Sequence, residues 1–151
     1  MTIGLASDHA GFDIKEGIRL FLAGKDIPLI DYGCGAGERV DYVDFAEKAL
    51  LGRAAGECER LILVCGTGIG MSLVANKFPG VRATLCCDPY MAEMSRKHND
   101  SNCLTMGGRI LPLDEALHIV EIWLTTGFDD GRHQVRLDKI MEIEKRFYKT
   151  S

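Results

Sequence analysis

The segment from Leu61 to Ala75 restricts the possible folds of this chain more than any other stretch. It reads Leu-Ile-Leu-Val-Cys-Gly-Thr-Gly-Ile-Gly-Met-Ser-Leu-Val-Ala, an apolar run followed by a glycine-rich loop and a helix-like pattern. An apolar run of this kind is typical of a parallel strand buried on both faces. Glycines allow tight turns and a close approach of the backbone to a ligand. We therefore predict a strand, a tight turn and a helix, in that order.

The loop from Cys65 to Gly70 has the features of an anion-binding site. The first amides of a helix are unpaired within it and its N-terminus is partly positive, so a phosphate or a developing oxyanion could bind there. The same environment favours thiolate over thiol, so Cys65 could act as a nucleophile or a base. The alternative is a small cysteine buried at a strand end. The loop alone leaves both interpretations open.

A dinucleotide-binding loop is a further alternative. Gly66 and Gly68 begin a G-x-G-x-x-G pattern, and Asp88 follows about 20 residues later, where such folds place a ribose-binding acid. The third glycine position holds Met71, however, and two strand-like segments precede a loop that normally opens the domain. This mismatch disfavours a bound dinucleotide.

Composition excludes several classes of function. The chain has 151 residues, which fit one domain spanning 1–151, and its formal net charge of −4 offers no basic field for nucleic acid. We see no secretion signal and no apolar window that approaches a membrane span, and so expect a cytoplasmic protein without membrane contact. The six cysteines show no zinc or redox-dithiol spacing, so we expect reduced thiols and no metal.

Strand-like runs alternate with helical patterns along the chain. The runs cover residues 3–6, 28–30, 61–64, 83–87 and 103–106, and the helical patterns cover a stripe from Ile14 to Leu22, then 44–55, 89–97, a segment from Pro112 and 132–148. This alternation predicts a parallel sheet flanked by helices. The last helix has a wide apolar face that includes Leu137, Ile140 and Phe147. That face either caps the domain or packs on a second subunit, and we favour the second subunit.

Polar residues follow several of the predicted strands. They are Ser7-Asp8-His9-Ala10-Gly11, Cys65-Gly66-Thr67-Gly68, Asp88 and Gly107-Gly108-Arg109. Each has an ordinary explanation as a cap, turn or surface residue. Ligands bind beyond the carboxyl ends of parallel strands, so the shared edge favours a binding site built from these residues together.

Four motifs in this order resemble the ribose-5-phosphate isomerase B family, which includes galactose-6-phosphate isomerase subunits. They are Ser7-Asp8-His9-Ala10-Gly11, the Cys65–Gly70 loop with Ala75-Asn76-Lys77, His98-Asn99-Asp100 and Gly107-Gly108-Arg109, and the similarity continues through Gly131-Arg132-His133 and Arg136. Val43 is one departure, since family members commonly have proline there.

The resemblance implies a Rossmann-like α/β/α sandwich with a parallel five-stranded sheet and a C-terminal helix that packs on the partner subunit. It also implies a homodimer or a dimer of dimers with shared active sites, in which aldose and ketose phosphates are interconverted without cofactor or metal.

The resemblance further implies roles for individual residues. Cys65 would transfer the proton between C1 and C2 through a cis-enediolate, and His98 would protonate the ring oxygen of the cyclic sugar. Asp8 and Thr67 would handle hydroxyl protons, and Tyr42 would line the sugar site. The positions for binding the substrate and its phosphate are Asp8, His9, Tyr42, Gly66, Thr67, Gly68, Ile69, Gly70, Asn99, Arg109, Arg132 and Arg136.

Several alternatives stay open. His98 also suits the C-terminal end of a helix, and Arg132 and Arg136, four residues apart on one helix face, also suit a solvated surface. Ribose 5-phosphate is the first choice of substrate, with allose 6-phosphate or galactose 6-phosphate as alternatives. A non-catalytic phosphosugar-binding protein could have the same fold, but the presence of Cys65 and His98 favours an enzyme.

Overall fold

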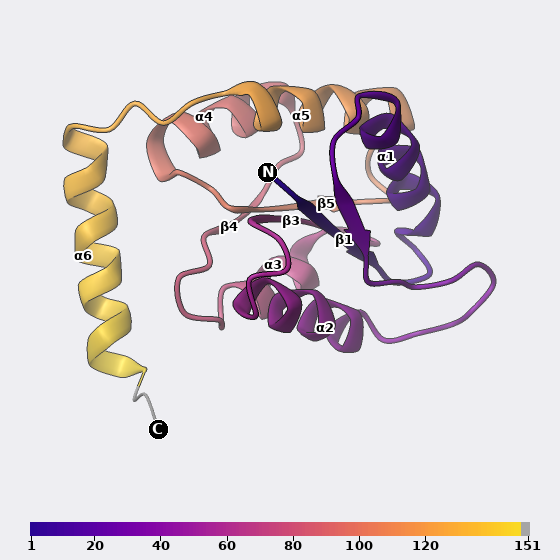
Figure 1. The fold of residues 1–151 in the computed structure, drawn as a ribbon, viewed down its shortest axis with the longest axis horizontal. Helices are drawn as coiled ribbons and strands as arrows, with labels where there is room; N and C mark the ends of the chain where they lie inside the picture. The colour runs from indigo at the N-terminus through magenta and orange to yellow at the C-terminus, as the bar shows by residue number, and fades with distance from the viewer. Residues whose placement is uncertain (149–151) are drawn as a thin grey trace.

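Five parallel strands form the centre of the computed structural model, which describes residues 1–148 (Figure 1). The strands are β1 (Ile3–Ser7), β2 (Leu29–Asp31), β3 (Arg60–Cys65), β4 (Ala83–Leu85) and β5 (Cys103–Gly107). Their order across the sheet is β2-β1-β3-β5-β4, and every neighbouring pair is parallel. The predicted parallel sheet is therefore confirmed, although β4 is shorter than the apolar run suggested.

Helices cover both faces of this sheet (Figure 1). They are α1 (Phe12–Gly24), α2 (Tyr42–Ala54), α3 (Ile69–Ala75), α4 (Pro89–Asn99), α5 (Leu113–Thr125) and α6 (Arg132–Phe147). The helices α1, α4 and α5 pack on one face, and α2 and α3 pack on the other. The result is the three-layered α/β/α sandwich expected for alternating strands and helices.

The apolar run of β3 explains its central position. Ile62 and Val64 belong to the core beneath α1 and α5, whereas Leu61, Leu63 and Cys65 belong to the core beneath α2 and α3. Successive strand residues point to opposite faces, so only a strand covered on both sides buries them all.

The connections leave an opening between β1 and β3 at the carboxyl edge of the sheet. These strands are neighbours, with Ser7 opposite Val64. The chain leaves β1 for α1 on one face, but leaves β3 for α3 on the other. Loops that diverge from adjacent strands in this way form the usual ligand-binding crevice of open α/β sheets.

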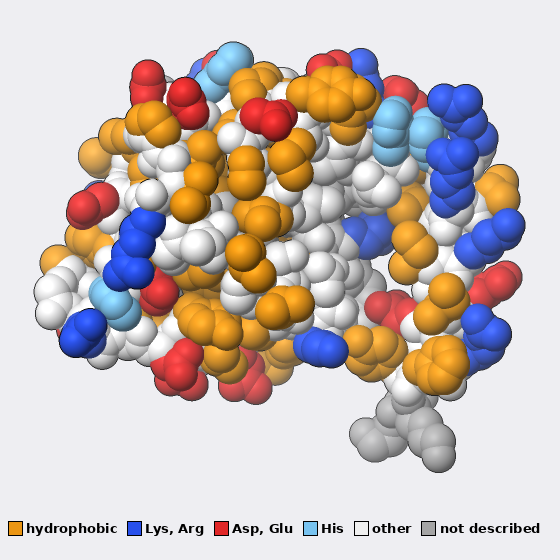
Figure 2. All heavy atoms as spheres, turned by 180° about the vertical axis from the view of Figure 1, so that it is seen from behind, with side chains coloured by type: hydrophobic (Ala, Val, Ile, Leu, Met, Phe, Trp, Pro, Cys, Tyr) orange, Lys and Arg blue, Asp and Glu red, His pale blue; other side chains and the backbone are white. Residues whose placement is uncertain are grey.

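The C-terminal helix α6 stands apart from the sandwich (Figure 1). Its far end is tethered by the Gly80 amide, which donates to the Glu144 carboxylate at 2.9 Å. A cavity of about 290 Å³ lies between α6 and the β4 region, and the hollow is visible in Figure 2. Apolar side chains on α6 remain exposed, namely Val135, Ile140, Met141, Ile143 and Phe147. Among the described residues, no helix combines the length and apolar character needed to cross a membrane.

Candidate functional site

A cavity of about 420 Å³ lies at the carboxyl edge of the sheet, where the loops after β1 and β3 diverge. Most of its lining consists of residues singled out from the sequence. The lining residues are Asp8, Tyr42, Cys65, Gly66, Thr67, Ile69, Gly70, Leu73 and Arg109. Three separate loops therefore converge on one opening, as their positions at the carboxyl ends of parallel strands required.

Cys65 ends β3 at the base of this cavity and is 4% exposed. Its Sγ accepts a hydrogen bond from the Gly68 amide at 3.2 Å. The loop can fold back in this way because Gly68 has φ of +80°, and a Cβ there would lie 2.7 Å from the backbone of Met106. A backbone N–H directed at the sulfur stabilises negative charge on it. The local structure therefore suits a cysteine that gives up and regains a proton.

The loops after β3 and β5 are tied to each other. The Gly108 amide donates to the Cys65 carbonyl at 2.7 Å, and the Arg109 amide donates to the Gly66 carbonyl at 3.0 Å. These bonds hold the exposed Arg109 guanidinium beside Gly66 at the opening of the cavity. The arrangement places a positive charge in the cavity that the thiol also lines, where it can attract an anionic ligand.

The loop after β1 adds a carboxylate and an imidazole. Asp8 is 7% exposed, and its Oδ1 accepts a hydrogen bond from the Gly11 amide at 3.0 Å. His9 is exposed, and its Nδ1 lies 3.2 Å from the Val40 carbonyl oxygen. This contact links the β1 loop to the segment before α2, so His9 lies beside the cavity region without lining it.

His98, Asn99, Arg132 and Arg136 form a separate group at the opposite edge of the sheet. The helix α4 starts after β4, at the carboxyl edge, and runs back so that the chain can enter β5 from the amino edge. The five-residue strand β5 separates these edges, and a strand of that length spans roughly 16 Å. Within one chain, His98 therefore lies across the depth of the sheet from the Cys65 cavity.

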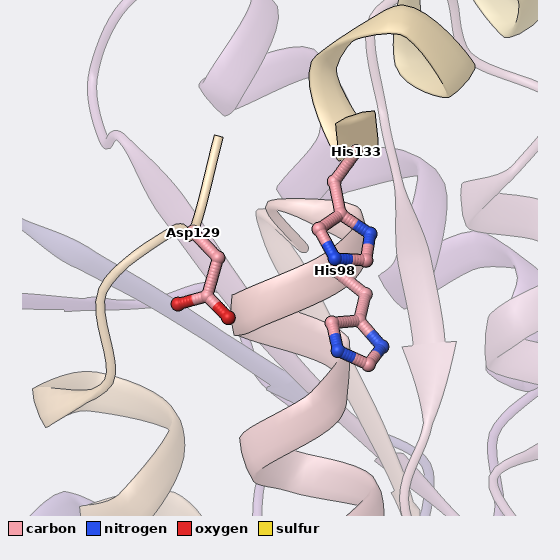
Figure 3. A group of neighbouring side chains, drawn as sticks. All are labelled: His98, Asp129 and His133. Carbon is pink, nitrogen blue, oxygen red and sulfur yellow. The ribbon is translucent and has the colours of Figure 1, made fainter. Parts of the chain in front are cut away.

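His98 packs against His133, which the sequence motif included but to which we assigned no role. Their rings stack with centroids 4.2 Å apart and planes 7° apart (Figure 3). His133 is 5% exposed. The Arg132 Nε donates to its Nε2 at 3.5 Å, and the Arg136 Nη1 lies 3.4 Å from its Nδ1. The two arginines thus face one buried imidazole from both sides.

Burial and the surrounding charges disfavour the protonated form of His133. Burial lowers the pKa of His133, and the neighbouring His98, Arg132 and Arg136 lower it further, while Asp129 acts in the opposite direction. Figure 3 shows the Asp129 carboxylate beside the two rings. The Arg132 and Arg136 guanidinium groups lie beside His133, and this pair of positive charges suits an anion such as a phosphate group.

The same cluster is the candidate for metal binding among the described residues. One possible ligand atom each from His98, Asp129 and His133 lies within 4.8 Å of the others. However, the nearly parallel rings direct their nitrogen lone pairs side by side instead of toward one point. Both His133 nitrogens also face guanidinium groups, which repel a cation. This arrangement does not fit a metal ion.

A pH dependence of stability follows from the lowered pKa of His133. Below about pH 6.5, the ordinary value for histidine, the unfolded chain takes up a proton that the folded chain resists. The free energy of unfolding should therefore fall as the pH decreases from 6.5 through the lowered pKa. We expect this loss to be smaller in His133→Gln, as measured by urea unfolding between pH 7.5 and 5. Parallel loss in both proteins would contradict the assignment.

Leu73, Asp129 and His133 are the contributions that the sequence analysis missed. Leu73 is an apolar residue in a helix and gives no sequence signal of lining a cavity. His133 did carry a signal, since it lies three residues before Arg136 and so shares a helix face with it. Of the other predicted residues, Gly68 lies under the cavity as the donor to Cys65, and Asn99 borders the hollow beneath α6.

Comparisons with known proteins agree with this geometry over nearly the whole chain. A family model described as Ribose/Galactose Isomerase matches residues 3–140. Ribose-5-phosphate isomerase B of Escherichia coli (strain K12) is 44% identical over 144 residues, covering 95% of this chain and 97% of that protein. The 4-deoxy-4-sulfo-D-erythrose isomerase of Clostridium sp. (strain MSTE9) is 39% identical over 159 residues and 99% of each chain.

A solved structure of the ribose-5-phosphate isomerase B of Clostridium thermocellum is also similar. It superposes with a TM-score of 0.95 at 49% sequence identity, covering 98% of this chain and 100% of that one. The Rossmann-like fold expected from the sequence motifs is therefore confirmed by a protein of closely similar structure.

Proposed function

The chain belongs to the ribose/galactose isomerase family, and on that basis we propose that it interconverts ribose 5-phosphate and ribulose 5-phosphate without a cofactor. The observation that carries this proposal is the Cys65 thiol held under the glycine loop, at the base of a cavity lined by Asp8, Thr67 and Arg109. Relatives named for ribose 5-phosphate and for a four-carbon sulfosugar make the choice of sugar a separate question, and the five-carbon phosphate is our first choice.

In the first step of the proposed reaction, the cyclic aldose opens. His98 donates a proton to the ring oxygen, and the C1 hydroxyl loses its proton as the aldehyde forms. The C–O ring bond breaks, and its electron pair stays on the oxygen that receives the proton from His98. Asp8 and Thr67, which line the cavity, would exchange the hydroxyl protons.

In the second step, Cys65 moves a proton between carbons. The thiolate takes the C2 proton of the aldehyde, the C–H electrons form the C1–C2 double bond, and negative charge develops on the C1 oxygen. The amides of Gly66 to Gly70 hold this cis-enediolate, an interaction that can contribute several kcal/mol. A proton then moves from the C2 hydroxyl to the C1 oxygen, so that the negative charge lies on the C2 oxygen. Return of the Cys65 proton to C1, as the C2 oxygen forms the carbonyl, gives the ketose and regenerates the thiolate.

The proposal requires a second copy of the chain. His98 and the Arg132–Arg136 pair lie across the sheet from Cys65, so one chain alone cannot present all of them to one small sugar. A partner would bring its His98 and arginines to the Cys65 cavity, where Arg109 and His9 complete the phosphate site. Exposed Ile69 and Leu73 in the cavity lining, and the exposed apolar side chains of α6, are surfaces that such a homodimer would bury.

An isotope experiment tests the proposed chemistry. Ribose 5-phosphate is incubated with the protein in D₂O containing EDTA and no added nicotinamide, and the product is examined by NMR. We expect deuterium at C1 of ribulose 5-phosphate, because a thiol exchanges its proton with solvent before returning it. Complete retention of the substrate hydrogen, together with loss of activity in EDTA, would contradict proton transfer through Cys65.

Kinetic assays with three sugar phosphates separate the alternatives for substrate and for function. Values of kcat/KM for ribose 5-phosphate, allose 6-phosphate and galactose 6-phosphate rank the sugars directly. We expect ribose 5-phosphate to rank first. Binding of all three without turnover of any would instead identify a non-catalytic phosphosugar-binding protein.

A further inference from the structure

The chain reverses direction immediately after His98 and Asn99. Asp100 caps the end of α4 with φ of 43° and ψ of 48°, a left-handed conformation that asparagine and aspartate tolerate better than most residues. The last turn of a helix leaves its carbonyl groups unpaired and tends to fray. His98 must hold its acidic imidazole in place from this last turn, so the end of α4 needs support from elsewhere in the fold.

Two arginines supply that support through the Asp100 carboxylate. The Arg82 Nη2 donates to Oδ2 at 2.8 Å, and the Arg96 Nη1 donates to Oδ1 at 2.8 Å. Arg82 comes from the segment before β4 and Arg96 from the last turn of α4. We call Arg82, Asp100 and Arg96 the α4 clamp.

The α4 clamp also holds the backbone that follows His98. The Arg82 Nε donates to the carbonyl of Asn99 at 3.1 Å and to that of Asp100 at 3.0 Å. The Arg96 Nη1 donates to the carbonyl of the fully buried Ser101. Three consecutive carbonyl groups at the end of the helix are therefore paired with guanidinium groups.

Asp100 is also the negative charge that this basic region requires. The Arg96 side chain is 5% exposed and that of Asp100 is 37% exposed, so the pair is partly shielded from solvent. Arg60, the first residue of β3, also feels these charges. Burial and the charge of Arg96 lower the pKa of Arg60, whereas the Asp100 carboxylate raises it. Removing the carboxylate would leave Arg82 and Arg96 facing each other without a counter-ion.

We infer that Asp100 is a positioning residue: through the α4 clamp it fixes the end of α4 so that His98 and Asn99 meet the sugar ring of the substrate. This inference rests on the proposed function. Because Asp100 acts through His98, its loss should slow ring opening, which needs a placed acid, far more than the proton transfer at Cys65.

Two reactions of the same protein sample separate these steps. Isomerisation of ribose 5-phosphate begins from a closed ring and needs the acid. Deuterium exchange at C1 of ribulose 5-phosphate in D₂O needs only Cys65 and the amide loop, since the phosphate on O5 prevents this ketose from closing a five-membered ring. The ratio of the two rates at saturating substrate therefore reports on His98 without depending on how much protein is folded.

The variant is Asp100→Asn, which keeps the shape of the side chain and its tolerance of left-handed backbone but removes the charge. We expect kcat for ribose 5-phosphate to fall by about tenfold or more, equivalent to ~1.4 kcal/mol in the barrier, and ketose exchange to change by less than about twofold. Asp26→Asn is the matched control, since Asp26 also has a positive φ, of 55°, but lies after α1 away from both clusters. It should leave both rates unchanged.

Arg82→Lys provides a second variant in case Asp100→Asn does not fold. Lysine keeps the charge but cannot reproduce the three hydrogen bonds of Arg82 to residues 99 and 100, so the same selective loss is expected. Equal losses in both reactions, or no loss in either, would overturn the positioning role. Failure of the wild-type protein to catalyse either reaction would instead overturn the proposed function on which the inference rests.

Discussion

Cys65→Ala should lower kcat for ribose 5-phosphate by roughly a thousandfold, within the range typical of losing a general base. The substitution removes the only thiol that lines the cavity in the described part of the chain, but leaves the Gly68 amide and the rest of the loop in place. Phosphosugar binding should therefore persist. Steady-state kinetics measure the first effect, and calorimetric titration of the variant with ribose 5-phosphate measures the second.

Two other cysteines provide controls for this variant. Cys34 is also buried, at 2% exposure, but lies outside the cavity, so Cys34→Ala tests the effect of losing a buried thiol elsewhere. Cys87 is exposed, so Cys87→Ala tests whether alkylation of a surface thiol contributes to the loss of activity. Iodoacetamide should inactivate the wild type and Cys87→Ala at the same rate, and substrate should slow both. Near wild-type kcat in Cys65→Ala would place the base elsewhere.

The strands and the Cys65 loop could be predicted because their causes are local. The run Leu61 to Val64 can be fully buried only in a strand covered on both faces, and Gly68 occupies a conformation that other residues resist. The convergence of Asp8, Cys65 and Arg109 also followed from the sequence, since the carboxyl ends of parallel strands share one edge.

Other features depend on contacts between distant segments and left no pattern in the sequence. Arg96 and Asp100 are only four residues apart, but Arg82 joins them only because the segment before β4 lies beside the end of α4. The stacking of His98 on His133 likewise depends on how α6 leaves the loop after α5. The apolar face of α6 was recognised, but periodicity alone did not reveal that the helix stands away from its own sandwich.

The division of the candidate residues between two edges of the sheet makes the central claim testable. If each active site takes Cys65 from one subunit and His98 from the other, then Cys65→Ala and His98→Ala should each be nearly inactive alone. A mixed dimer of the two would contain one site with both defects and one site with neither. Random exchange of subunits should therefore restore about a quarter of the wild-type activity per chain, as the symmetry of a dimer requires.

A pair of variants on the same side of the site is the matched control. Asp8 lines the cavity together with Cys65, so dimers that combine Cys65→Ala with Asp8→Ala would carry one defect in every site and should stay inactive. In each mixture the two variants are denatured and refolded together. The heterodimers, which carry two different affinity tags, are then isolated so that their formation is established. Isolated dimers are then assayed with ribose 5-phosphate.

The activity of the isolated Cys65→Ala/His98→Ala heterodimer is the most direct test of the account. We predict about half the activity of a wild-type dimer, since one of its two sites is intact, and none above background for the Cys65→Ala/Asp8→Ala heterodimer. A Cys65→Ala/His98→Ala heterodimer as inactive as its parents would contradict an active site shared between the Cys65 cavity of one chain and the His98 cluster of the other.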